Sequence, residues 1–500
     1  MALAKYDLLI GGEWEKPHNG KYENATNPSN GESVGQYALA DKTDTDKAID
    51  IAREVFEDGK WSRLPLNKRG SVLKKAAEIM KEKTEDLVQL EMANGGKPIR
   101  QASFFDVPIS IACMEYYSTL EPRELRKRIE QPDFPGTYGI VDHEPYGVVA
   151  AIAPWNLPLL MASWKTAPAL LAGNSVVLKP SSLTPLSALK FGEILYEAGL
   201  PRGTLSVVSG TGGVVGSELA SNKGVDVLSF TGSTETGKEV MRLASGNVKK
   251  VLMELGGKSP NIVFEDADLE KAVSGAMFAV FLHSGQLCES GTRLILSEKI
   301  YDSFMSKMKA RVHAMRVGPT DSMETDIGPV ISKEQLNTVE SYIASGKSEG
   351  AKMFSGGPVD ELTLKAGYYV KPTIFTDIRP EMKIWKEEIF GPVLSVMKFK
   401  DEDEAVRIAN DTMYGLAAGV WSSSVERALR VGSRIRAGTV WINDYHLLTT
   451  YAPRGGYKQS GFGRELGEDG LYEYMQTKHY FVNESGDVEE TAYSLISAVV

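Results

Sequence analysis

The sequence predicts an α/β protein with two sheet-and-helix domains and a small β arm. Apolar strand-like segments alternate with helical segments from residue 147 to residue 254, with helices expected at 185–198 and 234–244. A second alternation runs from 259 to 443. Such alternation is typical of parallel sheets whose two faces are covered by helices.

The chain before the first alternation divides into three parts. Residues 1–45 alternate short apolar segments with turns, which predicts a small β region on the surface. From 44 to 121, apolar residues recur at three- and four-residue spacings, so we expect amphipathic covering helices, with Cys113 packed inside one of them. Residues 122–136 are rich in charge and proline, and residues 137–143 alternate in polarity, which indicates an extended arm.

Five predicted strands are followed by loops of unusual composition. The loops are 154–158 (Pro-Trp-Asn-Leu-Pro), 179–182 (Lys-Pro-Ser-Ser), 210–216 (Gly-Thr-Gly-Gly-Val-Val-Gly), 231–237 (Thr-Gly-Ser-Thr-Glu-Thr-Gly) and 254–257 (Glu-Leu-Gly-Gly). Ligands of parallel sheets bind beyond the carboxyl ends of the strands, where glycines let backbone amides approach a pyrophosphate. The pattern G-x-G-x-x-G fails by one residue, because Val215 stands where the third glycine belongs. Each loop alone is also explained as a tight turn, but the set predicts a dinucleotide site.

Cys288 lies on a loop of small residues between a predicted helix at 269–283 and a predicted strand at 293–297. This position presents its thiol to a ligand, so Cys288 is a candidate nucleophile. The alternative is a small buried apolar side chain, since free cysteines are often buried.

The composition restricts the expected partners. The 500 residues carry a net charge of −10, which argues against a nucleic-acid partner or an anionic membrane surface. No apolar run approaches the ~18 residues of a membrane span, and no basic leader precedes an apolar core. With two cysteines, no disulfide framework is implied. We therefore expect a cytoplasmic protein that binds a small molecule and other copies of itself.

Six ordered segments carry a resemblance to a known family. They are 154–158, 230–237, 253–260, 285–288, 387–392 and 456–464. Through them essentially the whole chain resembles the aldehyde dehydrogenase superfamily, and residues 244–250 and 441–446 resemble its bacterial broad-substrate and betaine-aldehyde-like members.

The resemblance implies a division of the chain into domains. Residues 1–124 and 145–254 would form a Rossmann-type cofactor domain, and residues 255–455 an α/β catalytic domain. Residues 125–144 and 456–500 would be oligomerisation or bridging segments. We expect a homodimer or homotetramer built from the arm and from the apolar C-terminal run at 495–500.

The resemblance also implies a reaction, the oxidation of an aldehyde to a carboxylic acid with reduction of NAD(P). Cys288 would form a thiohemiacetal and then a thioester, the Asn156 amide would bind the oxyanion, and Glu254 would activate the hydrolytic water. Alternatively, Asn156 caps a turn and Glu254 pairs with Lys258. Glu465 resembles a family carboxylate that relays protons, but a structural ion pair explains it as well.

Cofactor contacts carry over in the same way, and no metal is implied. The residues concerned are Trp155, Lys179, Gly212, Gly232, Ser233, Glu388 and Phe390. The family pattern Lys-Pro-x-Glu departs at its last position, where this chain has Ser182. A carboxylate there binds the ribose of NAD and repels the extra phosphate of NADP, so its loss predicts use of both cofactors with some lean towards NADP.

The substrate and the reaction class are not decided by the sequence. The betaine-aldehyde branch holds its cation among aromatic rings, and this chain keeps Trp164 but has Leu157 and Arg454 where aromatics are common. A fixed positive charge from Arg454 opposes a quaternary ammonium, so betaine aldehyde is an alternative to broad aliphatic and aromatic aldehydes. The sequence also leaves open a cysteine-dependent esterase or thioesterase, a CoA-acylating enzyme and a catalytically idle member of the fold.

Overall fold

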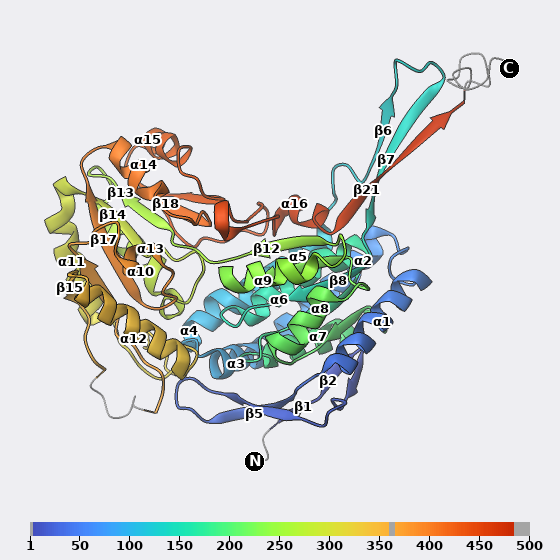
Figure 1. Cartoon of the computed structure of the whole chain (residues 1–500), viewed down its shortest axis with the longest axis horizontal. Helices are drawn as coiled ribbons and strands as arrows, with labels where there is room; N and C mark the ends of the chain where they lie inside the picture. Colours follow the sequence, from blue (N-terminus) through green and yellow to red (C-terminus); the bar gives the residue numbers. More distant parts are fainter. Residues whose placement is uncertain (1–3, 360–365, 485–500) are drawn as a thin grey trace.

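The computed structural model describes residues 4–359 and 366–484. Two large sheets, each covered by helices, form two lobes, and a narrow three-stranded sheet projects away from them (Figure 1). No helix among the described residues is long and apolar enough to cross a membrane.

The eight-stranded sheet of the first lobe has a parallel centre, as predicted. Its strands in spatial order are β12 (Lys250–Glu254), β11 (Val227–Thr231), β8 (Val148–Ile152), β9 (Ser175–Lys179) and β10 (Leu205–Val207). All five residues of β8, of β9 and of β11 are buried, which fits strands covered by helices on both faces. Parallel strands end at one edge, so the five loops meet there.

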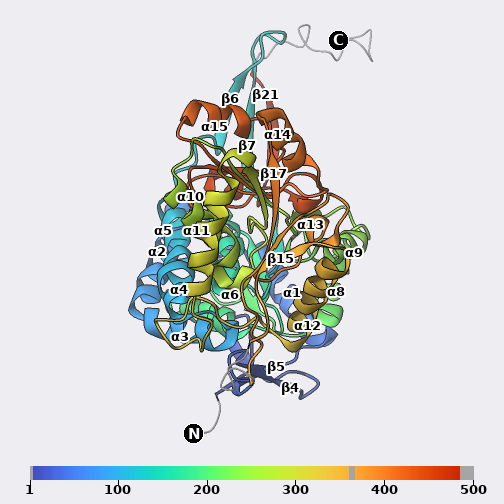
Figure 2. The same cartoon turned by 90° about the vertical axis from the view of Figure 1, so that its left-hand side faces the viewer.

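Antiparallel strands from the two ends of the chain complete this sheet. β20 (Gly461–Phe462) pairs with β12, while β2 (Leu8–Ile10) pairs with β10 and with β3 (Glu13–Glu15). The prediction of a surface β region for residues 1–45 is therefore wrong for β2, whose Leu-Leu-Ile triplet is buried on both faces. Only β1 (Lys5–Tyr6), β4 (Tyr22–Thr26) and β5 (Ser33–Ala38) form a separate small sheet, as Figure 2 shows for β4 and β5 at the bottom of the view.

Helices cover both faces of the first sheet. They are α1 (Lys42–Asp58), α2 (Leu66–Glu82), α3 (Thr84–Gly95), α4 (Ile99–Gln101), α5 (Val107–Thr119), α6 (Pro158–Ala172), α7 (Leu186–Glu197), α8 (Ser217–Ser221) and α9 (Thr234–Ala244). The helical prediction for 44–121 is confirmed, and α9 has the predicted bounds. Cys113 is fully buried in α5, as expected for a packed thiol.

The seven-stranded sheet of the second lobe is parallel except at one edge. Its order is β15 (Lys352–Ser355), β16 (Thr373–Thr376), β17 (Val393–Phe399), β14 (Arg293–Ser297), β13 (Pro260–Val263), β18 (Ala417–Trp421) and β19 (Thr439–Ile442), with β15 antiparallel. Its helices are α10 (Leu269–Phe281), α11 (Tyr301–Ala314), α12 (Lys333–Ser348), α13 (Lys383–Lys386), α14 (Glu402–Asn410) and α15 (Val425–Gly432).

The predicted helix at 269–283 ends early. α10 stops at Phe281, and a 3-10 turn (Leu282–Gly285) follows, in which His283 and Ser284 have φ of 49° and 56°. Left-handed backbone at two successive non-glycine residues is strained, so tertiary contacts hold this turn. The Ser284 hydroxyl donates to the Gly328 carbonyl at 2.8 Å and supplies one such contact.

The projecting arm is an antiparallel sheet of β6 (Arg126–Glu130), β7 (Thr137–Pro145) and β21 (Met475–Asn483). β7 lies in the middle and pairs with β21 along nine residues. The short helix α16 (Gly467–Tyr472) leads into β21. The predicted strand at 495–500 lies outside the described residues.

Candidate active site

Cys288 lies on the turn between the 3-10 helix and β14, and its side chain is half-buried. Backbone packs closely against this turn at two positions where only glycine fits. A Cβ on Gly285 would lie 2.2 Å from the Gly391 carbonyl oxygen, and one on Gly257 would lie 2.1 Å from the Cys288 carbonyl oxygen. The segment that follows Glu254 therefore packs directly against the backbone of Cys288.

Asn156 belongs to the loop after β8, and its side chain reaches the cysteine loop. Its Nδ2 donates to the Gln286 carbonyl at 2.8 Å, and the residue is 8% exposed. The alternative that Asn156 caps a turn is not what the structure shows, because the bond spans 130 residues and α6 has no side-chain cap. Asn156 is thus fixed against the backbone of the cysteine loop, two residues before Cys288.

Glu254 ends β12 and is buried without a hydrogen-bond partner on Oε1 among the described residues. Burial, together with the negative charge of Glu465, raises the pKa of Glu254 to about 8. The alternative of an ion pair with Lys258 is not formed, because Nζ of that buried lysine also has no hydrogen-bond partner among the residues described. Burial lowers the pKa of Lys258 to about 7.

Glu465 forms a buried ion pair. Lys165 Nζ lies 2.6 Å from Glu465 Oε1 and also donates to the Ser229 hydroxyl at 3.0 Å. Both charged side chains are at most 5% exposed. The structure therefore shows the ion pair, placed close enough to influence the pKa of Glu254.

A second buried ion pair was missed from the sequence. Arg454 pairs with Glu289, the residue after Cys288, and both side chains are at most 9% exposed. Glu289 thus partly compensates the positive charge of Arg454, so the fixed charge expected to oppose a quaternary ammonium is weaker than the sequence suggests. The available signal was that Arg454 and Glu289 bring opposite charges into segments otherwise made of uncharged residues.

Three predicted cofactor residues line the ends of β9 and β10. Lys179 is 3% exposed, and its Nζ donates to the Pro180 carbonyl at 2.9 Å. Burial lowers the pKa of Lys179 to about 8. Ser182 is half-buried three residues later, and Gly212 begins a π-helical turn (Gly212–Gly216) where a Cβ would meet no atom within 4 Å. This open backbone suits the close approach of a ligand.

The remaining cofactor residues lie beside β11 and before β17. Ser233 caps α9 by accepting from the Thr236 amide at 3.2 Å, directly after Gly232. The Trp155 and Phe390 rings meet edge to face, with centroids 5.1 Å apart.

Glu388, which precedes β17, is held by the glycines that follow Glu254. Its Oε1 accepts from the Gly257 amide at 3.0 Å, and a Cβ on Gly256 would lie 2.2 Å from Oε2. Burial raises the pKa of Glu388 to about 7.

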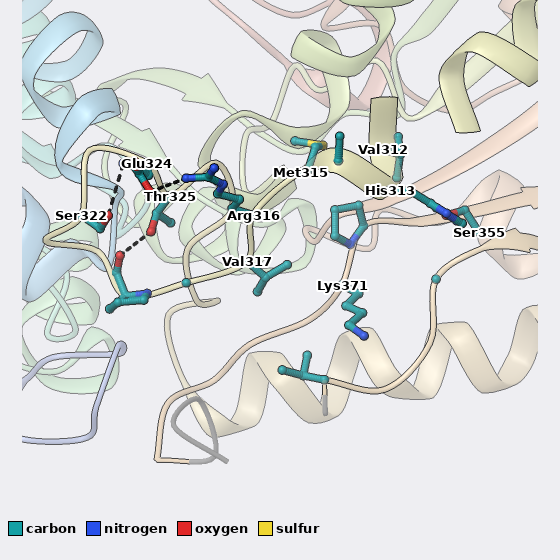
Figure 3. A pocket seen from close by; sticks show the side chains of 16 residues that line it. Val312, His313, Met315, Arg316, Val317, Ser322, Glu324, Thr325, Ser355 and Lys371 are labelled. Atoms are coloured by element: carbon teal, nitrogen blue, oxygen red, sulfur yellow. Dashed lines mark hydrogen bonds and ion pairs between the residues drawn. The ribbon is translucent and has the colours of Figure 1, made fainter. Parts of the chain in front are cut away.

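A separate cavity lies away from these residues. Its volume is about 840 Å³. It lies between the end of α11 with the segment that follows, the end of β15, and the segment before β16 (Figure 3). Residues such as Arg316, Glu324 and Thr325 line it, and none of the predicted site residues does. We assign it no role in the reaction.

A family model for the aldehyde dehydrogenase family matches residues 14–480. The chain belongs to this family. Among curated relatives, the betaine aldehyde dehydrogenase of Bacillus subtilis is 46% identical over 477 residues, covering 95% of this chain and 97% of that protein. Human retinal dehydrogenase 2 is 42% identical, covering 94% and 90%.

Solved structures agree with this aldehyde dehydrogenase assignment. The crystal structure of betaine aldehyde dehydrogenase from Staphylococcus aureus in complex with NAD+ superposes with a TM-score of 0.95 at 40% identity, covering 97% of this chain and 96% of that one. A mutant of the same enzyme carries a BME-modified cysteine, at a TM-score of 0.94. The predicted fold is confirmed, and the chain is an NAD(P)-dependent aldehyde dehydrogenase that oxidises aldehydes.

Proposed function

We propose that Cys288 is the nucleophile, Asn156 an oxyanion donor and Glu254 the hydrolytic base. One observation carries this assignment. The loops bearing Asn156 and Glu254 both touch the Cys288 turn, through the Asn156–Gln286 hydrogen bond and the Gly257–Cys288 backbone contact. These contacts join loops of both lobes at the Cys288 turn, and Glu254 lies near enough to raise the pKa of its thiol, which supports the proposal.

In the first half-reaction, Cys288 Sγ adds to the aldehyde carbon. One N–H of the Asn156 amide is held by Gln286, which orients the second N–H towards the developing oxyanion. The Cys288 backbone N–H is the other donor, and each donor contributes roughly 3 kcal/mol in comparable sites. When bound, the nicotinamide of NAD(P) accepts the hydride, and the acyl group stays on Cys288 as a thioester.

In the second half-reaction, Glu254 removes a proton from the water that attacks the thioester. A carboxylate with a pKa near 8 is a stronger base than an exposed glutamate, and its free Oε1 leaves a site for that water. The Cys288 thiolate is the leaving group, and the carboxylic acid departs.

The described residues fit a dinucleotide. Lys179 Nζ uses one of its three protons on Pro180, which leaves donors for a ribose. The open backbone at Gly212 suits a pyrophosphate, and the Trp155–Phe390 pair walls an apolar space for the nicotinamide. Glu388, anchored by Gly257, would accept from the second ribose.

NADP use follows from Ser182. Serine removes the negative charge that repels the 2′-phosphate, and Lys179 supplies a nearby positive charge. The loss of one rejecting charge is worth about 1 to 3 kcal/mol, on the scale of a hydrogen bond to a charged group. We therefore propose dual cofactor use with a lean towards NADP.

Replacing Ser182 with glutamate should lower kcat/KM for NADP by about tenfold or more and leave kcat/KM for NAD within a few-fold. The restored carboxylate repels the phosphate and accepts from the ribose. Steady-state kinetics with each cofactor measure this. Ser181→Glu is the matched control, since it adds the same charge one residue away. Equal losses with both cofactors in Ser182→Glu would contradict the proposal.

We propose a broad range of aliphatic and aromatic aldehydes as substrates, with betaine aldehyde as the alternative. Pairing of Arg454 with Glu289 weakens the positive charge that would repel a cation, while Trp164 offers an aromatic face. A panel of aldehydes, run with NAD and with NADP and monitored by cofactor reduction, decides between them. Addition of CoA should not raise turnover.

We also propose that the arm mediates self-association. β21 is an edge strand, and the exposed rings of Phe134 and Phe481 meet at 5.9 Å beside exposed Ile129. Apolar side chains on an unpaired strand edge favour pairing with another copy.

Phe481→Asp should shift the assembly from dimer or tetramer towards monomer, because it places a charge on that edge. Sedimentation at micromolar concentration measures the change. Met323→Asp, at an exposed apolar residue of the second lobe, is the control and should leave the assembly intact. A wild-type protein that sediments as a monomer would refute the proposal.

A further inference from the structure

We propose that Arg454 is a further catalytic residue, a buried cation that stabilises the Cys288 thiolate and is held in place by Glu289. This inference rests on the proposed role of Cys288 as nucleophile. Arg454 Nη2 lies 3.9 Å from Cys288 Sγ. Because the arginine side chain is 9% exposed, water screens its attraction to a thiolate poorly.

The guanidinium is fixed from three directions. It lies over the Trp164 ring, 5.3 Å from the centroid, and it pairs with the Glu289 carboxylate. The backbone of Arg454 exchanges two hydrogen bonds of 2.7 Å with the backbone of Glu465, which fixes the start of the side chain. An arginine held in this way loses little conformational freedom when the thiolate forms.

Glu289 is itself anchored, so we assign it as a positioning residue. His446 Nδ1 lies 2.8 Å from Glu289 Oε1, and its Nε2 lies 3.1 Å from the Ala279 carbonyl at the end of α10. The Tyr445 hydroxyl donates to the Glu289 carbonyl at 2.8 Å. The carboxylate orients the guanidinium and also weakens its field at the sulfur.

Burial and two neighbouring acids, Glu388 and Glu254, oppose formation of the Cys288 thiolate, and a nearby cation counteracts them. Burial, with the carboxylates of Glu388 and Glu254, raises the pKa of the Cys288 thiol to about 11, although Arg454 lowers it. At neutral pH the thiolate fraction therefore depends on how strongly Arg454 opposes burial and two acids.

The two members of the pair should act in opposite directions. Arg454→Met should slow alkylation of Cys288 by iodoacetamide, and Glu289→Gln should accelerate it, each by about threefold or more at a pH below the thiol pKa. A nearby charge shifts a thiol pKa by about one unit or more, which changes the thiolate fraction about tenfold. A thiolate of lower pKa is also a weaker nucleophile, and this offsets about half of the effect on a logarithmic scale, which leaves a change in rate of about threefold. Arg454→Lys keeps the charge and should restore most of the rate.

The measurement uses the full-length enzyme without aldehyde or cofactor. Cys288→Ala gives the blank, and the only other cysteine, Cys113, is fully buried. A merely structural pair would move both rates in the same direction, so a wild-type or faster rate in Arg454→Met, or a slower rate in Glu289→Gln, overturns the proposal. Thermal unfolding monitors folding, and if Arg454→Met does not fold, Arg454→Lys and Glu289→Gln still decide the sign. Full dehydrogenase activity in Cys288→Ala would instead overturn the nucleophile assignment.

Discussion

Glu254→Gln should release one equivalent of reduced cofactor rapidly and then turn over slowly. The carboxylate acts after hydride transfer, so the amide variant forms the thioester but hydrolyses it slowly. Loss of a general base typically costs 10²–10⁴-fold, and we expect a fall of about that size in steady-state kcat. Rapid mixing with aldehyde and cofactor separates the first turnover from the steady state.

The pH dependence of kcat also tests the role of Glu254. The base works when deprotonated, and the pKa of Glu254 is about 8, so hydrolysis-limited kcat should rise with pH up to about 8 and level off above it. Glu254→Gln should lose this rise. Glu340→Gln, at an exposed carboxylate on α12, is the control and should keep both rate and profile. Equal loss of first turnover and steady state in Glu254→Gln would show that the assigned role is wrong.

Cys288→Ala should reduce dehydrogenase activity to background. Without the thiol no covalent adduct forms, and removal of a nucleophile in a comparable enzyme costs on the order of a millionfold. The cavity left is small because the site is half-open, so the fold should survive. Activity assays with both cofactors, together with NAD binding by fluorescence, separate lost chemistry from lost structure.

The matched control is Cys113→Ala, which removes the other thiol. Cys113 is fully buried in α5, far along the chain from the reacting groups, so its loss should cost stability and leave turnover within a few-fold. If Cys288→Ala kept appreciable activity while Cys113→Ala lost it, the two cysteines would have to exchange their assigned roles.

The sequence predicts those features that depend on neighbours along the chain. The bounds of α9 follow from Ser233 as its cap and from apolar spacing, and the strands β8, β9, β11 and β12 follow from continuous apolar runs. The prediction for β2 is wrong because three apolar residues do not reveal whether a short strand joins a large sheet or a small one. The residues of the site could be named through the family resemblance.

What the sequence could not supply were the pairings between distant residues. Arg454 and Glu289 are 165 positions apart, and Lys165 and Glu465 are 300 apart. Local patterns hold no information on such contacts, which arise only when segments far apart in the chain come together on folding. For this reason the sequence predicts an uncompensated charge at Arg454, and it does not predict the protonation behaviour of Glu254 beside Glu465.

The pairing of β20 with β12 has a consequence for the order in which the enzyme matures. Glu254 is paired with Gly461, and a Cβ on Gly461 would lie 1.9 Å from the Met253 carbonyl oxygen. β20, which pairs with the strand that carries Glu254, is therefore synthesised about two hundred residues after Glu254 itself. A nascent chain that already contains the thiol and the carboxylate still lacks this support, so the catalytic geometry is completed only after nearly the whole chain has left the ribosome.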